Sequence, residues 1–332
     1  MRGRRSRAAV AVIALMASVG CAKGIARCVA AEGGSGRACA LPGYPARSFD
    51  LSVPAGDTAT KRPLLLAFHG GGGSRKSAES ITCPGGKLDA PGCLGNVALA
   101  HGFVVVRPDG TGARLLPNVR TWNAGGGTDG WQCVSGRGCK DGADDVAYVR
   151  TLLDEIARLT AIDERRVYVT GLSNGAAFAH RIACELGDRV AGVVAVAGAN
   201  QYEAAGGACP RPVRVLQIHG TEDPCWAYGG GSAACAQDDG GRKQSVEASM
   251  AAWATTNGCT GSRSLPASDR DPTDGTYLIK IVYEGCRAPT ELWRIEGGGH
   301  GWPSGSPYFS ERRIGKVSRE ADSEDINGFL SH

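Results

Sequence analysis

The stretch Tyr168-Val169-Thr170-Gly171-Leu172-Ser173-Asn174-Gly175-Ala176 decides the fold prediction. It begins as an apolar, β-branched run typical of a buried strand, passes through Gly-x-Ser-x-Gly and continues into residues that favour a helix. Glycines at 171 and 175 allow a sharp strand-to-helix turn without a clash of Cβ atoms. Such a turn points the hydroxyl of Ser173 away from the sheet, where it can serve as a nucleophile.

Strand and helix signals alternate on both sides of this turn. Apolar runs predict strands, and apolar residues at helical spacing predict helices. This alternation is typical of an α/β fold with a mostly parallel central sheet and helices on both faces. The predicted strands cover 64–68, 103–106, 167–169, 190–196, 213–218, 277–283 and 292–295, and the predicted helices cover 146–159, 245–257 and 322–330.

The serine motif needs support, because a chain with 50 glycines can produce Gly-x-Ser-x-Gly by chance. The alternative is a tight turn with an incidental serine. A serine hydroxyl is a weak nucleophile unless an imidazole takes its proton, and the imidazole in turn needs a carboxylate to orient it. In hydrolases built on this turn, the acid and then the histidine follow the serine along the chain.

Two downstream loops can supply these partners. His300 lies in Gly297-Gly298-Gly299-His300-Gly301-Trp302-Pro303, after a predicted strand, and is the expected base. Asp223 follows the strand at 213–218 and is the expected acid, with the adjacent Glu222 as the fallback. The other downstream histidines are less suitable: His180 falls on the helix after the serine as a surface or packing residue, His219 closes a strand, and His332 is the last residue.

A glycine-rich loop follows the strand at 64–68, with the sequence His69-Gly70-Gly71-Gly72-Gly73. Such a loop can turn backbone N–H groups toward a developing oxyanion. Gly70 and Gly71 are therefore expected to form an oxyanion hole together with the N–H of Asn174. A phosphate-binding loop is the weaker alternative, because Ser74-Arg75 does not provide the Gly-Lys-Ser/Thr ending of a P-loop.

The first 20 residues have the pattern of an export signal, with four arginines before the apolar run 8–19. Cleavage is open between a lipobox-like Gly20-Cys21, which would lipidate Cys21, and a small-residue site near residue 31. Residues 21–40 are expected to be a linker before a catalytic domain at 41–332. Without the four leader arginines the net charge of +4 falls to about zero, which gives no electrostatic reason to expect nucleic acid as a partner.

Cysteine usage agrees with export, because 13 cysteines are too many to remain free thiols outside the cytoplasm. Apart from Cys21, the other 12 allow six pairs, although spacing alone does not fix their connectivity. No Cys-x-x-Cys pair and no His-x-x-x-His accompany them, so no metal site is predicted. The pairings that we expect are Cys83–Cys93, Cys133–Cys139, Cys184–Cys209, Cys225–Cys235, Cys259–Cys286 and Cys28–Cys39.

From about residue 47 to the end, the chain resembles the secreted α/β-hydrolase esterases that include polyhydroxybutyrate depolymerases and feruloyl and acetylxylan esterases. The resemblance implies a cofactor-free carboxylic ester hydrolase with Ser173, Asp223 and His300 as its triad. It also implies that Trp122 and Trp302 line the substrate pocket. The motifs that carry it are His69-Gly70-Gly71-Gly72, Arg107-Pro108-Asp109-Gly110, Thr121-Trp122-Asn123, Asp144-Asp145-Val146, Gly171-Leu172-Ser173-Asn174-Gly175, His219-Gly220-Thr221-Glu222-Asp223 and His300-Gly301-Trp302-Pro303.

The resemblance leaves the ester itself open. Polyhydroxyalkanoate esters or oligomers are the leading expectation, and plant cell-wall feruloyl or acetylxylan esters are the alternative. No second module follows the hydrolase-like segment, which favours soluble or amorphous substrates over crystalline polymer. A monomer is expected, secreted or periplasmic, with an outer-envelope lipoprotein as the variant. Outside this class, a non-catalytic, envelope-anchored binding protein that kept the fold is the competing hypothesis.

Overall fold

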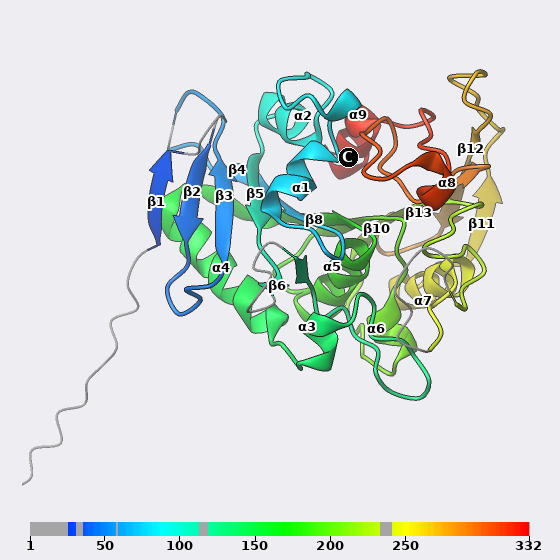
Figure 1. Ribbon diagram of the computed structural model, residues 1–332, viewed down its shortest axis with the longest axis horizontal. Helices are drawn as coiled ribbons and strands as arrows, with labels where there is room; N and C mark the ends of the chain where they lie inside the picture. The colour runs from blue at the N-terminus through cyan, green and yellow to red at the C-terminus, as the bar shows by residue number, and fades with distance from the viewer. Residues whose placement is uncertain (1–25, 31–35, 58, 113–118, 233–240, 332) are drawn as a thin grey trace, which may run out of the picture.

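The computed structural model describes residues 26–30, 36–57, 59–112, 119–232 and 241–331 (Figure 1). Its strands are β1 Arg27–Ala30, β2 Arg37–Ala40, β3 Ser48–Ser52, β4 Arg62–Phe68, β5 Val104–Pro108, β6 Thr111–Gly112, β7 Arg120–Thr121, β8 Ile162–Leu172, β9 Gly192–Val196, β10 Arg214–Gly220, β11 Gly261–Ser264, β12 Tyr277–Glu284 and β13 Thr290–Glu296. Its α-helices are α1 Arg75–Ser80, α2 Leu94–Ala100, α3 Arg137–Lys140, α4 Asp145–Leu159, α5 Asn174–Glu185, α6 Gln201–Ala204, α7 Val246–Asn257, α8 Glu311–Ile314 and α9 Ser323–Ser331.

All strands but β6 and β7 join one large sheet in the order β1-β2-β3-β5-β4-β8-β9-β10-β13-β12-β11. The central block from β5 to β13 is parallel, whereas antiparallel strands extend the sheet at both ends. Helices α4 and α5 lie on one side of the sheet, and α2 and α9 lie on the other (Figure 1). The predicted α/β-hydrolase fold, with a mostly parallel sheet covered on both faces, is confirmed.

Strand alternation divides the apolar residues between two cores. In β4, Leu64 and Leu66 point into the core beneath α4 and α5, whereas Leu65 and Ala67 point into the core beneath α2 and α9. Successive side chains of a strand leave opposite faces of the sheet, so a strand covered on both sides must be apolar throughout. This is why the central strands read as continuous apolar runs instead of alternating ones.

Helix α4 shows how the predicted spacing produces a packed element. Its apolar residues at 146, 149, 152, 153 and 156 are all buried against the sheet. The side chain of Asp144 caps its first turn by accepting a hydrogen bond from the N–H of Ala147, 2.9 Å away. The helix was predicted at 146–159, within one residue of its observed start.

The expectation that residues 21–40 form a linker is wrong where the structure describes them. Strand β1 pairs with β2, and β2 pairs with β3, so this segment extends the sheet at one edge. The Cys28–Cys39 disulfide ties β1 to β2. These short strands are exposed for the most part, so they lack the buried apolar run that identified the central strands. The predicted leader and Cys21 lie outside the described residues.

Five of the six expected disulfides are present, between the cysteine pairs 28–39, 83–93, 133–139, 184–209 and 259–286. Cys225 is also disulfide-bonded, but its expected partner Cys235 lies outside the described residues. Disulfides at this density are typical of proteins that fold in an oxidising compartment. Among the described residues, no helix has the length and apolar character needed to cross a bilayer.

Candidate active site

Ser173 occupies the turn between β8 and α5. Its backbone is in a left-handed conformation, with φ 58° and ψ −122°, which is uncommon for a residue that is not glycine. Its N–H donates to the carbonyl of Val196, 2.9 Å away, so the neighbouring strand β9 holds the turn in place. A strained residue that its surroundings hold this firmly is often found at a functional site.

The two glycines of the motif are required by close approach of backbone to backbone. A Cβ added at Gly175 would lie 2.5 Å from the carbonyl oxygen of His69 and 2.6 Å from that of Phe68. A Cβ added at Gly171 would lie 2.5 Å from the carbonyl carbon of Gly175. The start of α5 therefore rests against the end of β4, and any side chain at these positions would push the turn away from the sheet.

Asp223 and His300 meet at the carboxyl edge of the sheet, where β10 and β13 end. His300 Nδ1 lies 2.7 Å from Asp223 Oδ2, and both side chains are buried. The other carboxylate oxygen accepts hydrogen bonds from the N–H groups of Cys225 and Trp226, at 2.7 and 2.8 Å. Glu222, the fallback acid, is exposed and makes no hydrogen bond to His300 among the described residues.

Asp223 is held in its ionised form. Burial by itself raises the pKa of a carboxyl group, but His300 and hydrogen bonds from His219 and His300 outweigh it and lower the pKa of Asp223 well below its usual range. His219 Nε2 lies 3.2 Å from Asp223 Oδ2 and 2.8 Å from the carbonyl oxygen of Trp226. His219 thus bonds locally, as predicted, and also helps to fix the carboxylate.

Ser173 and His300 both line a cavity of about 810 Å³. No hydrogen bond joins their side chains among the described residues, although catalytic hydrogen bonds commonly shorten only when substrate is bound. The cavity brings together the segments that follow β4, β7, β8, β10 and β13. Its walls are completed by Gly71, Gly72, Val119, Thr121, Gln132, Val134, Ser135, Gly136, Arg137, Lys140, Asp141, Cys225, Trp226, Lys243, Tyr308, Phe309, Arg313 and Ile314.

Trp122 and Trp302, expected in the pocket wall, are instead fully buried in the core. Trp122 stacks on Phe178, with ring centroids 4.7 Å apart, and its Nε1 donates to the carbonyl of His69. Trp302 packs in the core beneath α2 and α9. The sequence motifs placed these residues beside the site but could not show which way their rings point.

The aromatic residues that do line the cavity are Trp226, Tyr308 and Phe309. The ring of Tyr308 lies edge-on to the imidazole of His300, with centroids 6.5 Å apart. Tyr308 and Phe309 are 36% and 48% exposed, among the few large apolar side chains that the described surface leaves open. Sequence reasoning missed all three, and the only available signal was an aromatic pair in a loop downstream of His300.

The glycine loop after β4 lies beside Ser173 at the cavity. Gly71 lines the cavity, and a Cβ added at Gly70 would come within 3.7 Å of Ser173 Cβ. Asn174 is the first residue of α5, and N–H groups in the first turn of a helix have no acceptor within the helix. Both expected sources of N–H donors therefore flank Ser173.

His69 fixes this loop from behind. Its Nδ1 bonds to the carbonyl oxygen of Gly70 at 2.8 Å, and its Nε2 accepts the N–H of Gly110 at 2.9 Å. The ring must be neutral to make both bonds, with its proton on Nδ1. Burial favours this state and lowers the pKa of His69 to about 4.

His180 is a second buried, neutral histidine, so the alternative of a surface residue is wrong and the alternative of a packing residue holds. Its ring lies between Gln217 and Trp253, bonded to one at each nitrogen. Burial lowers its pKa to about 4 as well. It lies on the buried face of α5 and is not among the residues that line the cavity.

These two histidines predict how stability depends on pH. In the unfolded chain both take up protons as the pH falls through about 6.5, whereas in the folded protein they stay neutral until about pH 4. The free energy of unfolding is therefore expected to fall between pH 6.5 and pH 4, by roughly 3 kcal/mol for each histidine, and to hold its full value above that window. Equilibrium denaturation at a series of pH values, with the disulfides intact, measures this free energy of unfolding.

The control for this prediction is His180→Gln, which removes one titrating ring but keeps an amide that can bond to its neighbours. This variant should lose about half of the pH dependence. Asp223 does not interfere, because a carboxyl group with a lowered pKa withdraws its stabilisation only below about pH 4. A free energy of unfolding that stays constant from pH 6.5 to 4 would contradict the prediction.

Asp223, Cys225 and His300 are near enough to one another to be considered as metal ligands. Cys225 is disulfide-bonded and so has no thiolate to offer. The carboxylate and the imidazole are already bonded to each other. The hydrogen bond and the disulfide already use these donors, so they do not fit a metal site.

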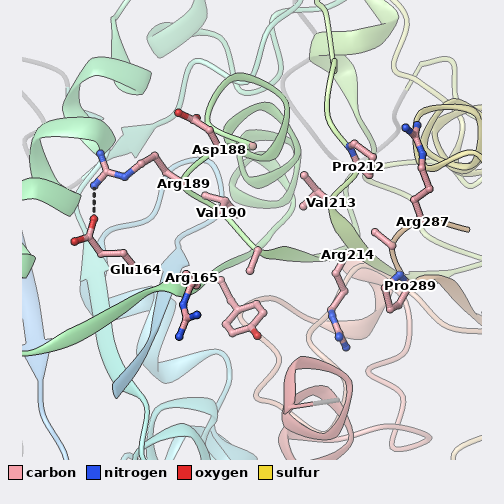
Figure 2. Close-up of a pocket in the computed structure, with 14 residues that line it drawn as sticks. Glu164, Arg165, Asp188, Arg189, Val190, Pro212, Val213, Arg214, Arg287 and Pro289 are labelled. Carbon is pink, nitrogen blue, oxygen red and sulfur yellow. Dashed lines mark ion pairs between the residues drawn. The ribbon is translucent and has the colours of Figure 1, made fainter. Parts of the chain in front are cut away.

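A second hollow, of about 380 Å³, lies at the opposite edge of the sheet, near the amino ends of β9 and β10 (Figure 2). Four of its lining residues are arginines, but they do not converge on one point. Arg189 pairs with Glu164 at 3.7 Å, and Arg214 donates to the carbonyl of Phe329. The chemistry-bearing residues are all at the other edge, so we place the site there.

Comparison with known proteins finds relatives of this chain that are named as esterases. The chain is 30% identical over 264 residues to Feruloyl esterase B of Piromyces equi, covering 76% of this chain and 42% of that protein. It is 28% identical over 302 residues to NocK of Nocardia uniformis subsp. tsuyamanensis, a protein named as an esterase, covering 86% and 75% of the two chains. The chain is a sequence relative of these esterases. The predicted resemblance to esterases is thereby confirmed.

The matches cover only part of some of these proteins. The chain spans less than half of the length of the Piromyces equi esterase. No family model matches it. Among solved structures, an acetyl xylan esterase from Aspergillus awamori is 14% identical to this chain, with a TM-score of 0.47. The match covers 77% of this chain and 89% of that chain.

Proposed function

We propose that this esterase relative is a serine carboxylesterase with Ser173 as nucleophile, His300 as base and Asp223 as the orienting acid. The observation that carries the proposal is the buried Asp223–His300 pair, 2.7 Å apart, which opens on the same cavity as the strained Ser173 turn. A buried carboxylate is costly unless hydrogen bonds or a functional network retain it. The glycine loop beside Ser173 completes the set that acyl transfer requires.

The reaction follows from this arrangement. Ser173 Oγ attacks the ester carbonyl while His300 Nε2 takes its proton, and Asp223 stabilises the imidazolium that forms. N–H groups of Gly71 and Asn174, with Gly70 beside them, stabilise the negative charge on the carbonyl oxygen. His300 then returns the proton to the departing alcohol. Water attacks the acyl-enzyme by the same route and releases the acid and free Ser173.

Two classes of natural ester are supported to different degrees. The proposal of polyhydroxyalkanoate esters or oligomers as substrates rests on the resemblance of the sequence motifs. Plant cell-wall esters have additional support from the relatives, which are named feruloyl and acetylxylan esterases. The aromatic walls at Trp226, Tyr308 and Phe309 suit both, because aromatic rings pack against hydroxycinnamoyl groups and aliphatic polyester alike.

A substrate panel separates these classes. Methyl ferulate, acetylated xylan and hydroxybutyrate oligomers are expected to differ in kcat/KM by more than tenfold, because a pocket shaped for one acyl group loses transition-state contacts with the others. A fluorophosphonate probe should label the protein at Ser173 in every case. Absence of both labelling and turnover would instead favour the non-catalytic binding protein.

We also propose that the protein acts after export. The disulfides support an oxidising compartment, and the basic, apolar leader supports secretion or transfer to the periplasm. A cleavage site near residue 31 would remove Cys28 and β1 from the sheet, so cleavage upstream of residue 27 agrees better with the fold. The lipid anchor at Cys21 and the monomeric state stay predictions.

A further inference from the structure

Ser135 lies on a short loop that reaches into the cavity opposite the glycine loop. The loop is closed by the Cys133–Cys139 disulfide. Ser135 itself has φ 58°, a positive value like that of Ser173, which is uncommon for a residue that is not glycine. The residue is exposed and lines the cavity that Ser173 and His300 share.

The loop is braced against the nucleophile turn. The side-chain amide of Asn174 donates to the carbonyls of Val134 and Trp122, both at 3.0 Å, and accepts the N–H of Trp122 at 2.7 Å. The N–H of Gly138 donates to Thr121 Oγ1 at 2.7 Å. The residue after the nucleophile therefore fixes the residue before Ser135, so the two turns keep a constant separation.

The hydroxyl of Ser135 points to the oxyanion side of the cavity. A Cβ added at Gly71 would lie 2.0 Å from Ser135 Oγ and 3.5 Å from Asn174 Cβ, so these three residues meet around one small space. Within the described residues, the Ser135 hydroxyl makes no hydrogen bond. A rigidly held hydroxyl without a protein partner, next to two backbone N–H donors, is arranged to bond to a ligand atom there.

We propose that Ser135 is a third donor of the oxyanion hole, and thus a catalytic residue in addition to the triad. The proposal rests on the proposed esterase function. As Ser173 attacks, the carbonyl oxygen gains charge between Gly71 and Asn174, and the Ser135 hydroxyl donates its hydrogen to that oxygen. The Cys133–Cys139 bridge keeps the loop in its strained conformation, so little reorganisation is needed in the transition state.

Two substitutions at this position test the proposal. Ser135→Ala and Ser135→Gly both remove the hydroxyl, but glycine is relaxed at positive φ whereas alanine is as strained as serine. If the hydroxyl is the cause, both variants should lower kcat on a p-nitrophenyl ester by about 10- to 100-fold with KM nearly unchanged. Ser262→Ala, an exposed serine on β11 outside the cavity, is the matched control and should stay within about twofold of wild type.

A second measurement distinguishes contact with the oxyanion from loop geometry. An alkylboronic acid forms a tetrahedral adduct with the serine, so its inhibition constant should rise in Ser135→Ala by about the factor by which kcat falls. The inference is overturned if both variants keep wild-type kcat, if only KM changes, or if glycine restores what alanine loses. If Ser173→Ala also remained active, the proposed function itself would fail, which is a separate outcome.

Discussion

Ser173→Ala is expected to lower kcat on a short p-nitrophenyl ester by about 10⁶-fold, because no other group at the turn can form the acyl-enzyme. The alanine keeps the same backbone strain as the serine, so folding should be little affected. Labelling by a fluorophosphonate probe should disappear together with the activity. Initial rates and circular dichroism on the same preparations measure both effects.

The comparison needs a serine variant that leaves the site intact. Ser262→Ala serves here too, because its side chain is exposed on the edge strand β11. It should retain both hydrolysis and labelling. Equal rates for wild type and Ser173→Ala would exclude Ser173 as the nucleophile and would leave the Gly-x-Ser-x-Gly turn as a purely structural feature.

Asp223→Asn is expected to have the second-largest effect, a loss of about 10⁴-fold in kcat. Asp223 Oδ1 accepts hydrogen bonds from two backbone N–H groups, so the amide oxygen of an asparagine must take that position. Its NH₂ group then faces His300 Nδ1, which must accept a hydrogen bond in place of donating one. The imidazole proton moves to Nε2, and the ring can no longer take the proton of Ser173.

Glu222→Gln is the matched control for this prediction, because it makes the same chemical change at the adjacent position. Glu222 is exposed and does not contact His300, so the rate should stay within about twofold. Thermal unfolding of both variants separates loss of catalysis from loss of fold. If Glu222→Gln were inactive and Asp223→Asn active, the fallback assignment would replace the present one.

Local sequence patterns were enough to predict a large part of the fold. Each central strand is buried on both faces, so it must be apolar at every position, and that composition is visible without coordinates. Strands β1, β2 and β11 are short and mostly exposed, so their residues have no such pattern. Their place at the sheet edges depends on hydrogen bonds between backbone groups. Many different side chains allow such pairing, so the sequence gives little sign of it.

The candidate site divides in the same way. Ser173, His300 and Gly71 could be found from the sequence, because a turn, a strand-end loop and a glycine run each have a chemical signature. The pocket aromatics could not, because an aromatic residue has the same propensity whether its ring is buried in the core, as in Trp122, or lines the cavity, as in Phe309. The path of the loop sets that orientation.

What the sequence by itself determined is the strand–turn–helix at Ser173 and the order of serine, acid and histidine along the chain. What only the tertiary structure decided is which of two adjacent carboxylates faces His300, and that Ser135 lies against Gly71. The physical reason is the distance along the chain over which the deciding interactions act. Turns and strands follow from neighbouring residues, whereas burial of Asp223 and the position of Ser135 follow from loops that contact one another only after the sheet has brought its strand ends together.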